Sequence, residues 1–387
     1  MRIAIIGQKG IPAKSGGVER HVEELSTRLA KSGHQVFVYA RNNYNIDKIK
    51  NYQGVNIINL PSIGTKHLDA ISHTFLACLD LFKRDVDIIH FHSIGPSFFI
   101  WLAKLLKPRT PILATFHTKC YEHKKWGWFA RLSLELGEAV CCIFADQVIT
   151  VSKSLYKYVK ENYKINPVYI PNGVPKAKNI SAKKISKIWG LKENNYILTV
   201  SRLIRHKGIQ YLIEAYQSLK TGKKLVIVGD GSFTDDYVKE LKKMAGTDKN
   251  IIFTGNQTGQ ILAELYSNAA IFVQPSESEG LSIALLEAMS YGKAIITSDI
   301  PENIEAIESY GLTFKNKKSS DLKGKIFYLL KRPALIKKLG LQSRKRAALE
   351  YNWEKVVCNI ERSYQAIIQE KRRAKIFHFR LAKKFIG

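Results

Sequence analysis

The stretch IFVQPSESEGLSIALLEAM, from Ile271 to Met289, decides the fold. It starts with a short apolar run, Ile271–Gln274, passes through a polar loop and continues with helical spacing over Ser282–Tyr291. A strand followed by a loop and a helix is the unit from which α/β proteins with parallel sheets are built. The rest of the chain repeats this unit.

The first half alternates expected strands and helices. The expected strands are Arg2–Gly7, Gln35–Ala40, Val55–Leu60, Asp87–His92, Pro111–Phe116 and Gln147–Ser152. The expected helices are Val18–Lys31, Leu68–Phe82, Pro96–Leu106 and Lys125–Phe144. Because the strands are nearly continuous apolar runs, we expect a parallel sheet that is covered on both faces.

The alternation pauses at Tyr169–Lys184, whose prolines, glycine and lysines predict a linker, and then resumes. The strands expected in the second half are Tyr196–Ser201, Leu225–Gly229, Ile251–Thr254, Ile271–Gln274 and Ala294–Thr297. The helices expected there are Ile209–Leu219, Asp235–Ala245, Ile261–Ala269 and Ser282–Tyr291, followed by a helical, basic stretch after Ser320. The predicted fold class is therefore α/β, with two Rossmann-like doubly wound domains in series.

Composition agrees with two domains. The chain has 387 residues, enough for two domains that each bury a core, and its content of 45% hydrophobic and 24% charged residues is typical of a globular protein. We find no apolar stretch of the roughly 18 residues that a membrane helix needs. Met1–Gly7 is expected to be a strand and not part of a signal peptide. Five cysteines without metal-ligand spacing favour reduced thiols and a cytoplasmic protein.

The formal net charge of +28 is the unusual feature of the composition. Such a charge favours an anionic partner, which can be nucleic acid, an acidic lipid surface or a phosphorylated ligand. The final segment, Lys371–Gly387, mixes basic and apolar residues; it can lie on an anionic membrane surface or dock as a helix on the first domain. The sequence has no interleaved aromatic platform or known nucleic-acid motif, so we do not expect nucleic acid as a partner.

Polar residues after the first strand of the second half predict an anion site. In open parallel sheets, ligands bind beyond the carboxyl ends of the strands. Arg202 and Lys207 follow that strand and offer a planar guanidinium and a mobile ammonium group. We expect them to neutralise a leaving diphosphate, although a solvated basic loop would have the same composition.

The opening stretch contains two glutamates near an expected helix start at Leu281. The backbone amides of Gly280, Leu281 and Ser282 would face a phosphate that the helix dipole stabilises. Carboxylates are good acceptors for sugar hydroxyls, so we expect Glu279 to hold a donor sugar and Glu287 to hold a ribose. The alternative is that both are ordinary helix-start and surface residues.

The first half offers weaker signals. Gly16 and Gly17 precede an expected helix and let an anion approach its free amides, but their spacing is not that of the dinucleotide fingerprint. His117 follows an expected strand and can donate or accept a hydrogen bond. We interpret His90 and His92 as structural, because no carboxylate or cysteine lies near them in the sequence to complete a metal site.

Taken together, these residues resemble a known family. The pattern Pro-Ser-x-x-Glu-Gly-Leu-x-x-x-x-Leu-Glu-Ala-Met around Glu279 and Glu287 is similar to the paired-glutamate signature of family-four retaining glycosyltransferases, which have the GT-B fold. The resemblance spans nearly the whole chain, because further motifs follow in the family's order: Gly16-Gly17, His117, Pro171-Asn172-Gly173-Val174, Ser201-Arg202, Lys207-Gly208 and Gly229-Asp230-Gly231. The opening Gly-Gln-Lys-Gly-Ile-Pro-Ala-Lys resembles a bacterial subgroup that includes rhamnosyltransferases of surface polysaccharide assembly.

The resemblance implies three parts and one activity. Residues 1–170 would form an acceptor-binding domain, residues 171–352 a donor-binding domain that faces it across a central cleft, and residues 353–387 a helix that crosses back to the first domain and ends in a basic tail. The chain would transfer a hexose or deoxyhexose from a nucleotide-diphosphate donor to a glycan or lipid-linked acceptor, with retention of anomeric configuration. Polysaccharide or glycolipid synthesis at the inner face of the plasma membrane would be its setting.

The resemblance also implies roles for single residues. Arg202 and Lys207 would bind the donor diphosphate, Glu287 the ribose and Glu279 the sugar hydroxyls, while His117 would lie beside the donor sugar. Further donor-site positions on the matching motifs are Gly16, Gly17, Gly229, Gly280, Leu281 and Ser282. At Ser298–Asn303 many relatives have a glycine pair that is missing here, so we assign no phosphate contact to that loop.

The resemblance also implies how the anomeric configuration is retained. The reaction would be a front-face displacement, in which the leaving phosphate helps to deprotonate the incoming hydroxyl. Positive side chains and helix amides would then replace the divalent metal of other transferases, so we expect no metal and no cofactor. A sugar-nucleotide epimerase on the same fold is one alternative, and a non-enzymatic binder of anionic surfaces is another. The glutamate pair favours the transferase over both.

Overall fold

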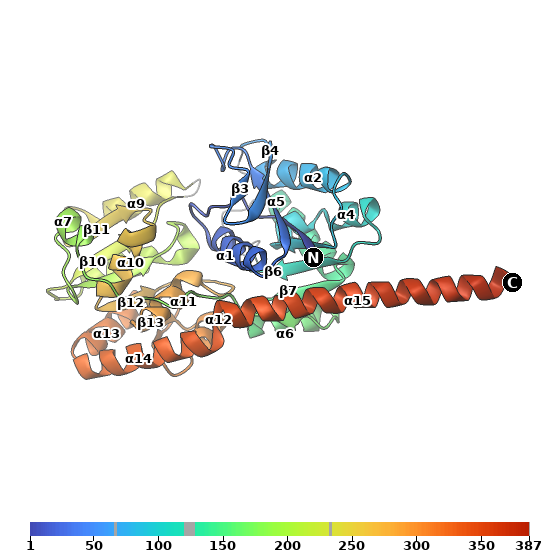
Figure 1. The fold of residues 1–387 in the computed structure, drawn as a ribbon. Helices are drawn as coiled ribbons and strands as arrows, with labels where there is room; N and C mark the ends of the chain where they lie inside the picture. Colours follow the sequence, from blue (N-terminus) through green and yellow to red (C-terminus); the bar gives the residue numbers. More distant parts are fainter. Residues whose placement is uncertain (66–67, 120–127, 232–233, 387) are drawn as a thin grey trace. The chain divides into compact units, whose positions relative to one another are not determined.

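The structure of the chain is a computed structural model. It describes residues 1–65, 68–119, 128–231 and 234–386, with the side chains of these residues except 129–130 and 374–386. The chain forms two compact units (Figure 1). Unit 1 comprises Met1–Pro171 and Trp353–Gly387, and unit 2 comprises Asn172–Asn352.

Unit 1 is built on an eight-stranded sheet with the order β3-β4-β2-β1-β5-β6-β7-β8. Neighbouring strands are parallel, apart from β3, which pairs antiparallel with β4. The strands are β1 Arg2–Ile6, β2 Gln35–Arg41, β3 Asn51–Tyr52, β4 Val55–Leu60, β5 Ile88–His92, β6 Ile112–Phe116, β7 Gln147–Thr150 and β8 Val168–Tyr169. The six strands expected in this half are all present, and the two-residue strands β3 and β8 are additional.

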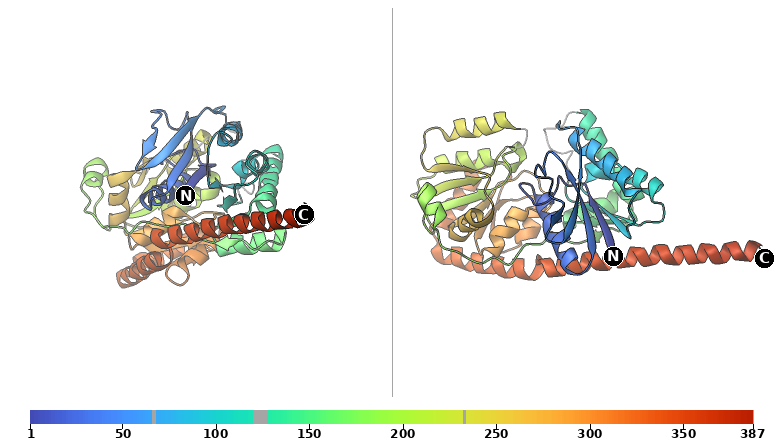
Figure 2. Two further views of the ribbon diagram at one scale, coloured as in Figure 1. Left: turned by 45° about the vertical axis from the view of Figure 1, so that its right-hand side comes forward. Right: turned by 45° about the horizontal axis from the view of Figure 1, so that its top comes forward.

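The helices of unit 1 are α1 Gly17–Lys31, α2 Leu68–Leu81, α3 Ile94–Ser97, α4 Ile100–Leu106, α5 Trp128–Phe144, α6 Lys153–Tyr163 and α15 Trp353–Ile386. The single helix expected at Pro96–Leu106 is wrong, because the backbone leaves regular helical geometry at Phe99 (φ −91°, ψ 10°) and separates α3 from α4. Residues 125–127, expected to start the next helix, lie outside the described residues. Figure 2 shows α15 continuing beyond the sheet.

Helices cover both faces of this sheet because successive strand residues point to opposite sides. On one face, Ile3 and Ile5 of β1 share a core with Val22 of α1 and Ile360 of α15. On the other face, the hydroxyl of Tyr39 of β2 donates a hydrogen bond to the carboxylate of an α2 residue. Helix α4 contacts both α2 and α5, so these helices form one layer.

Unit 2 contains a six-stranded parallel sheet with the order β11-β10-β9-β12-β13-β14. Its strands are β9 Tyr196–Val200, β10 Lys224–Val228, β11 Ile251–Gly255, β12 Ile271–Gln274, β13 Ala294–Ser298 and β14 Leu312–Phe314. Its helices are α7 Lys184–Trp189, the 3-10 turn η2 Arg205–Lys207, α8 Ile209–Gln217, α9 Asp235–Ala245, α10 Gly259–Asn268, α11 Ile283–Ser290, α12 Pro301–Ile307, α13 Ser319–Leu330 and α14 Pro333–Glu350. The five strands expected in this half are present, and β14 is additional. This strand order is that of a doubly wound Rossmann sheet.

The segment expected to be a linker is packed against unit 2. The amide of Val174 donates to the carbonyl of Tyr351 at 2.6 Å, and the amide of Ala177 donates to the hydroxyl of Ser290 at 3.0 Å. These bonds tie the segment to the carboxyl-terminal ends of α14 and α11, so it is an ordered strap on unit 2. The pattern of prolines and lysines could not reveal such long-range partners.

Both units confirm the expected fold class, two doubly wound parallel α/β domains. Among the described residues, no helix combines the length and the apolar character that crossing a membrane requires.

Candidate functional site

The strand order of unit 2 reverses between β9 and β12, which pair directly. A ligand crevice is expected outside the carboxyl ends of the two strands at such a point. Arg202 follows β9, and the loop that carries Glu279 follows β12. The two loops that the sequence assigns to donor binding therefore leave neighbouring strands at the same edge of the sheet.

Two backbone contacts join these loops. Gly208 has φ +70° and lies so close to Pro275 that a Cβ atom at position 208 would be 1.9 Å from the Pro275 carbonyl oxygen. The amide of Glu277 donates to the carbonyl of His206 at 2.7 Å. Because any side chain at position 208 would displace backbone, glycine is required for the close approach of the loops.

Lys207 and Glu279 form an ion pair between the two loops. The ammonium group of Lys207 donates to both carboxylate oxygens of Glu279, at 2.6 and 2.7 Å. The amide Nε2 of Gln274 donates to the same carboxylate at 2.6 Å. The two charged side chains are only 14% and 7% exposed, so each charge needs the other as compensation. The structure thus brings together two residues that the sequence places 72 positions apart.

Glu287 is held by a tyrosine that sequence reasoning missed. The hydroxyl of Tyr266 in α10 donates to Glu287 Oε2 at 3.1 Å and lies 3.3 Å from the carbonyl oxygen of Ala284. Burial first, and then the carboxylate of Glu287, raises the pKa of Tyr266 well above its usual value. The hydroxyl therefore stays protonated and acts as a donor that fixes the carboxylate. No sequence pattern around Tyr266 marks this role.

Helix α11 begins at Ile283, one residue after the start of the expected helix Ser282–Tyr291 and two residues after Leu281. Ser282 is its N-cap, and the Ser282 hydroxyl accepts a hydrogen bond from the amide of Leu285 at 3.4 Å. Serine is a preferred N-cap residue, which explains the shift. The amides of Gly280 and Leu281 therefore belong to the loop, and the amides that the helix itself leaves unbonded begin at Ser282.

Arg202 and Gly229 lie on adjacent strand ends. Gly229 has φ +132°, and a Cβ atom there would be 1.8 Å from the carbonyl oxygen of Ser201. The amide of Leu203 donates to the carbonyl of Asp230 at 2.8 Å, so the two loops pack backbone to backbone. Half-buried Arg202 lies within this packed loop pair.

In unit 1 the strand order reverses between β1 and β5. Gly16 (φ +99°) is the N-cap of α1 and Gly17 is the first residue of the helix. A Cβ atom at Gly16 would be 2.1 Å from Oε2 of Glu19, and Oε1 of the same carboxylate accepts a hydrogen bond from the amide of Lys9 at 3.2 Å. The glycine loop is thereby folded over the first turn of α1.

Three buried histidines gather beside this loop. His117, 7% exposed, follows β6, and its Nε2 lies 3.0 Å from Nδ1 of His92 at the end of β5. The ring of His21, from α1, lies 5.4 Å from the His92 ring and 5.1 Å from the His117 ring, centroid to centroid. The interpretation of His92 as purely structural overlooked its contact with His117. His21 was missed altogether, although it lies four residues after Gly17 on the same helix.

Burial lowers the pKa of both His92 and His117 well below the usual value, and neighbouring histidines lower it further. Both rings are therefore neutral at pH 7, and one donates the hydrogen bond that the other accepts. His90 faces the same side of the sheet and is held by the hydroxyls of Thr115 and Tyr364, each at 2.7 Å. Helix α15 also contacts these histidines, because Tyr364 bonds to His90 and the Trp353 ring lies 5.3 Å from the His21 ring.

Two family matches divide the chain between them. Residues 15–178 match the family described as Glycosyltransferase Family 4, and residues 181–346 match the family described as Glycosyl transferases group 1. The chain belongs to these glycosyltransferases. The resemblance seen in the sequence is confirmed at this level.

Solved structures and curated proteins similar to this glycosyltransferase agree. Sucrose-phosphate synthase from Thermosynechococcus elongatus superposes with a TM-score of 0.82 at 22% identity, over 95% of this chain and 99% of that one. HepE of Anabaena, solved in complex with UDP and glucose, superposes with a TM-score of 0.79 at 17% identity, over 95% and 100%. Alpha-monoglucosyldiacylglycerol synthase of Streptococcus pneumoniae is 26% identical over 85% of this chain and 78% of its own length. The two units thus have the GT-B fold.

The His21, His92 and His117 cluster is also the place where a divalent cation could bind to this glycosyltransferase. One ligand nitrogen from each ring lies within 4.8 Å of the others. Tetrahedral zinc with bonds of about 2.0–2.1 Å needs nitrogens about 3.3 Å apart, so the rings would have to move inward. The hydrogen bond between His92 and His117 accounts for that pair without an ion.

The buried histidines should make unit 1 sensitive to acid. Burial lowers the pKa of His73 to about 4 and those of His90, His92 and His117 well below 6.5. Below about pH 6.5 the unfolded chain takes up protons that the folded chain does not, so the free energy of unfolding falls with pH, by at most about 1.4 kcal/mol per pH unit for each histidine. Thermal melts should show Tm falling from pH 7.5 to 5.5, with a shallower fall in His73→Leu. A Tm that stays constant or rises toward pH 5.5 would contradict this.

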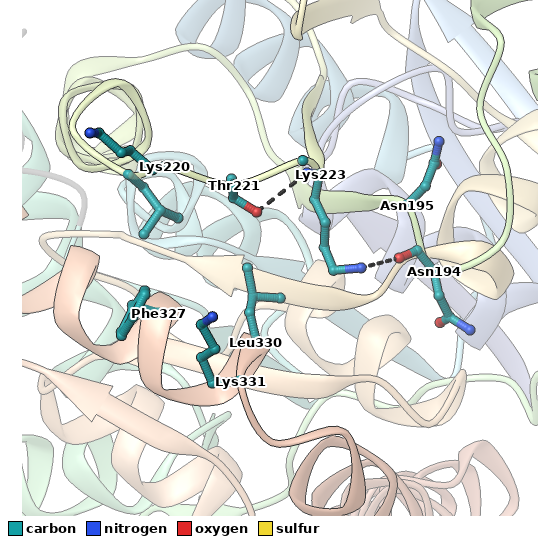
Figure 3. Close-up of a pocket in the computed structure, with 10 residues that line it drawn as sticks. Asn194, Asn195, Lys220, Thr221, Lys223, Phe327, Leu330 and Lys331 are labelled. Carbon is teal, nitrogen blue, oxygen red and sulfur yellow. Dashed lines mark hydrogen bonds between the residues drawn. The ribbon is translucent and has the colours of Figure 1, made fainter.

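A pocket of about 480 Å³ lies in unit 2 between the ends of several elements (Figure 3). Asn195 precedes β9, Lys223 lies just before β10, and Leu330 ends α13. These positions belong to the amino-terminal edge of the sheet, opposite the edge with Lys207 and Glu279. We therefore do not assign the donor to this pocket.

Proposed function

We propose that this glycosyltransferase moves a hexose or deoxyhexose from a nucleotide-diphosphate donor to a glycan or lipid-linked acceptor, with retention of anomeric configuration. The observation that carries the proposal is the buried pair of Lys207 and Glu279 at the strand-order reversal of unit 2. In this proposal Lys207 is the cation that binds the diphosphate, and Glu279 is the neighbouring carboxylate that binds the donor sugar.

The pair also bears on how a donor would bind. Lys207 and Glu279 neutralise each other in a nearly buried position. When a donor binds, its diphosphate competes for the ammonium group, and the carboxylate becomes free to accept hydrogen bonds from sugar hydroxyls. Binding of the donor thus exchanges one ion pair for two contacts to the substrate.

The reaction needs no enzyme nucleophile in this proposal. The bond between the anomeric carbon and the diphosphate oxygen breaks, while the acceptor oxygen bonds to the same face of that carbon. The acceptor proton passes to the departing phosphate oxygen. Lys207, Arg202 and the amides that begin at Ser282 stabilise the negative charge that builds up on the leaving group.

The remaining site residues have supporting roles in the same proposal. Glu287, fixed by Tyr266, binds the ribose of the donor. Gly229, Gly280 and Leu281 bring loop backbone close to the nucleotide. In unit 1, Gly16 and Gly17 border the phosphate and the acceptor. Neutral His117, fixed by His92, contacts the donor sugar.

The acceptor class is proposed from the relatives and from charge. One relative is named as a diacylglycerol glycolipid synthase, and another, from Campylobacter jejuni, as a transferase to an undecaprenol-linked sugar; the latter is 29% identical over 58% of this chain and 62% of its own length. A net charge of +28 suits an acceptor presented at an anionic membrane surface. We propose that the protein works at the cytoplasmic face of such a membrane, in polysaccharide or glycolipid synthesis.

Thermal-shift screening against a panel of nucleotide sugars tests the donor assignment. The true donor raises Tm in proportion to its occupancy, because it binds the folded state. Proton NMR of the product made with that donor should then show the donor's anomeric configuration. An epimerised nucleotide sugar without any transfer product would support the epimerase instead, and a panel without any stabilising member would overturn the donor assignment.

Chelation should leave the activity unchanged. Turnover in excess EDTA is expected to equal turnover without it, since the leaving group is neutralised by Lys207 and Arg202. Dialysed protein assayed with and without EDTA is the measurement, and added manganese is the control. Loss of turnover in EDTA that manganese restores would reject the metal-free mechanism, and restoration by zinc instead would point to the histidine cluster.

A further inference from the structure

Unit 1 exposes a large apolar surface on the layer formed by α2, α4 and α5. Its most exposed side chains are Phe82 at 65%, Leu105 at 71%, Trp128 at 79% and Ile143 at 67%. We call the exposed apolar side chains of these three helices and of Phe82, which follows α2, the apolar patch. Monomeric proteins rarely expose contiguous apolar surfaces of this kind unless something binds there.

The sequence of α2 repeats large apolar residues along the exposed side of the helix. Leu68, Ile71, Phe75, Leu79 and Phe82 are all exposed and recur every three or four residues, so they form one stripe along the helix. The opposite stripe of α2 is buried against the sheet. A helix that is apolar on both sides is expected to be covered on both sides.

Helices α4 and α5 extend the stripe into a surface. Trp101 and Leu105 are exposed one turn apart on α4, which contacts both other helices. On α5, Trp128, Leu132 and Leu136 are exposed at intervals of four residues. The patch therefore covers the outer side of a layer of three helices, which Figure 1 shows on one side of the unit 1 sheet.

Charge indicates what covers the patch. Exposed Lys83 and Arg131 are sequence neighbours of Phe82 and Leu132, and exposed Arg109 lies three residues after the end of α4. Lys371 of α15 and an α4 lysine share Asp146, at 3.2 and 3.0 Å. From Lys371 onward the sequence has seven basic residues and no acidic one. Basic side chains around an apolar surface fit an anionic lipid bilayer, whereas a second copy with a charge of +28 would be repelled.

We propose that the apolar patch on α2, α4 and α5 docks this protein on an anionic lipid surface, with the apolar side chains in the bilayer interface and the basic residues on the headgroups. Trp101 and Trp128 suit this depth, because tryptophan prefers the boundary between lipid and water. The inference rests on the proposed lipid-linked acceptor, because such an acceptor is the reason for this protein to dock on a membrane. The docking itself is tested by vesicle binding, which requires no turnover.

Flotation with lipid vesicles tests the proposal. Full-length protein should float with vesicles of phosphatidylglycerol and phosphatidylcholine, and less with phosphatidylcholine alone. The variant Phe82→Ser/Leu105→Ser/Ile143→Ser should lose at least about tenfold in partitioning, since it removes three large apolar groups. The matched control, Ile188→Ser/Leu341→Ser/Leu349→Ser, removes three exposed apolar side chains of unit 2 and should float like the wild type.

Two results would overturn the proposal, and a third would assign the patch to a different partner. Undiminished flotation of the patch variant overturns the proposal, and so does flotation that is lost only when residues 374–387 are deleted. A wild-type dimer that does not float, and that the patch variant dissociates, would make the patch an interface between copies. Tm and donor hydrolysis without vesicles show whether each variant is folded. Because donor hydrolysis is measured separately, a failed lipid surface is distinguishable from a failed transferase assignment.

Discussion

Lys207→Ala should lower kcat/KM for the donor by about a hundredfold or more. Lys207 supplies a positive charge to the leaving diphosphate, and deleting one such transition-state donor typically costs that much. The substitution also leaves the Glu279 carboxylate, 7% exposed, without its charge partner. Steady-state kinetics with the donor found by thermal shift measure the effect, and a normal rate would reject the site assignment.

Arg205 provides a matched control on the same 3-10 turn. Its guanidinium pairs with Glu240, and the two side chains are 52% and 42% exposed. Exposed pairs contribute little, so Arg205→Ala should change kcat/KM by less than about threefold. Arg202→Ala should resemble Lys207→Ala. If Lys207→Ala is unstable, Lys207→Met, which keeps the length of the side chain, provides the second measurement.

Glu279→Gln should weaken binding of the donor sugar without weakening binding of the diphosphate. The variant keeps the size of the side chain but loses the charge that strengthens hydrogen bonds to sugar hydroxyls. Such bonds contribute about 1.5–3 kcal/mol, so kcat/KM should fall about tenfold to a hundredfold. The affinity for the free nucleoside diphosphate should not fall, because Lys207 remains and no carboxylate competes with the diphosphate for its ammonium group.

Lys207→Ala should differ from Glu279→Gln in its affinity for the nucleotide. That variant should lose affinity for the nucleoside diphosphate itself, as titration calorimetry would show. Glu277→Ala, two residues away, is the control. The Glu277 carboxylate does not pair with Lys207; it accepts a hydrogen bond from the Tyr211 hydroxyl at 2.9 Å and pairs with Lys317 at 3.4 Å. Equal loss of nucleotide affinity in Glu279→Gln and Lys207→Ala would contradict separate roles.

Much of the fold was predictable because its signals are local. Apolar runs such as Ile271–Gln274 match a strand residue for residue, and the helix at Asp235–Ala245 has the expected bounds. The two-residue strands β3 and β8 were missed because so short a pairing leaves no period in the sequence. The ordered strap after Tyr169 was missed because its partners, such as Ser290, are remote along the chain.

The site was predictable where residues follow strands, since the carboxyl ends of parallel strands share an edge. This rule selected Arg202, Lys207 and Glu279. It could not select Tyr266 or His21, which lie on helices and reach the site residues only through tertiary packing. The start of α11 was placed one to two residues too early because a loop glycine and an N-cap serine both favour a helix start.

A crystal structure with the stabilising nucleotide sugar bound tests the central claim most directly. The account predicts diphosphate oxygens within hydrogen-bond distance of Lys207 Nζ and the Arg202 guanidinium, with Glu279 accepting from the sugar hydroxyls. A diphosphate bound elsewhere, for example in the pocket near Lys223 at the opposite edge of the same sheet, would contradict it.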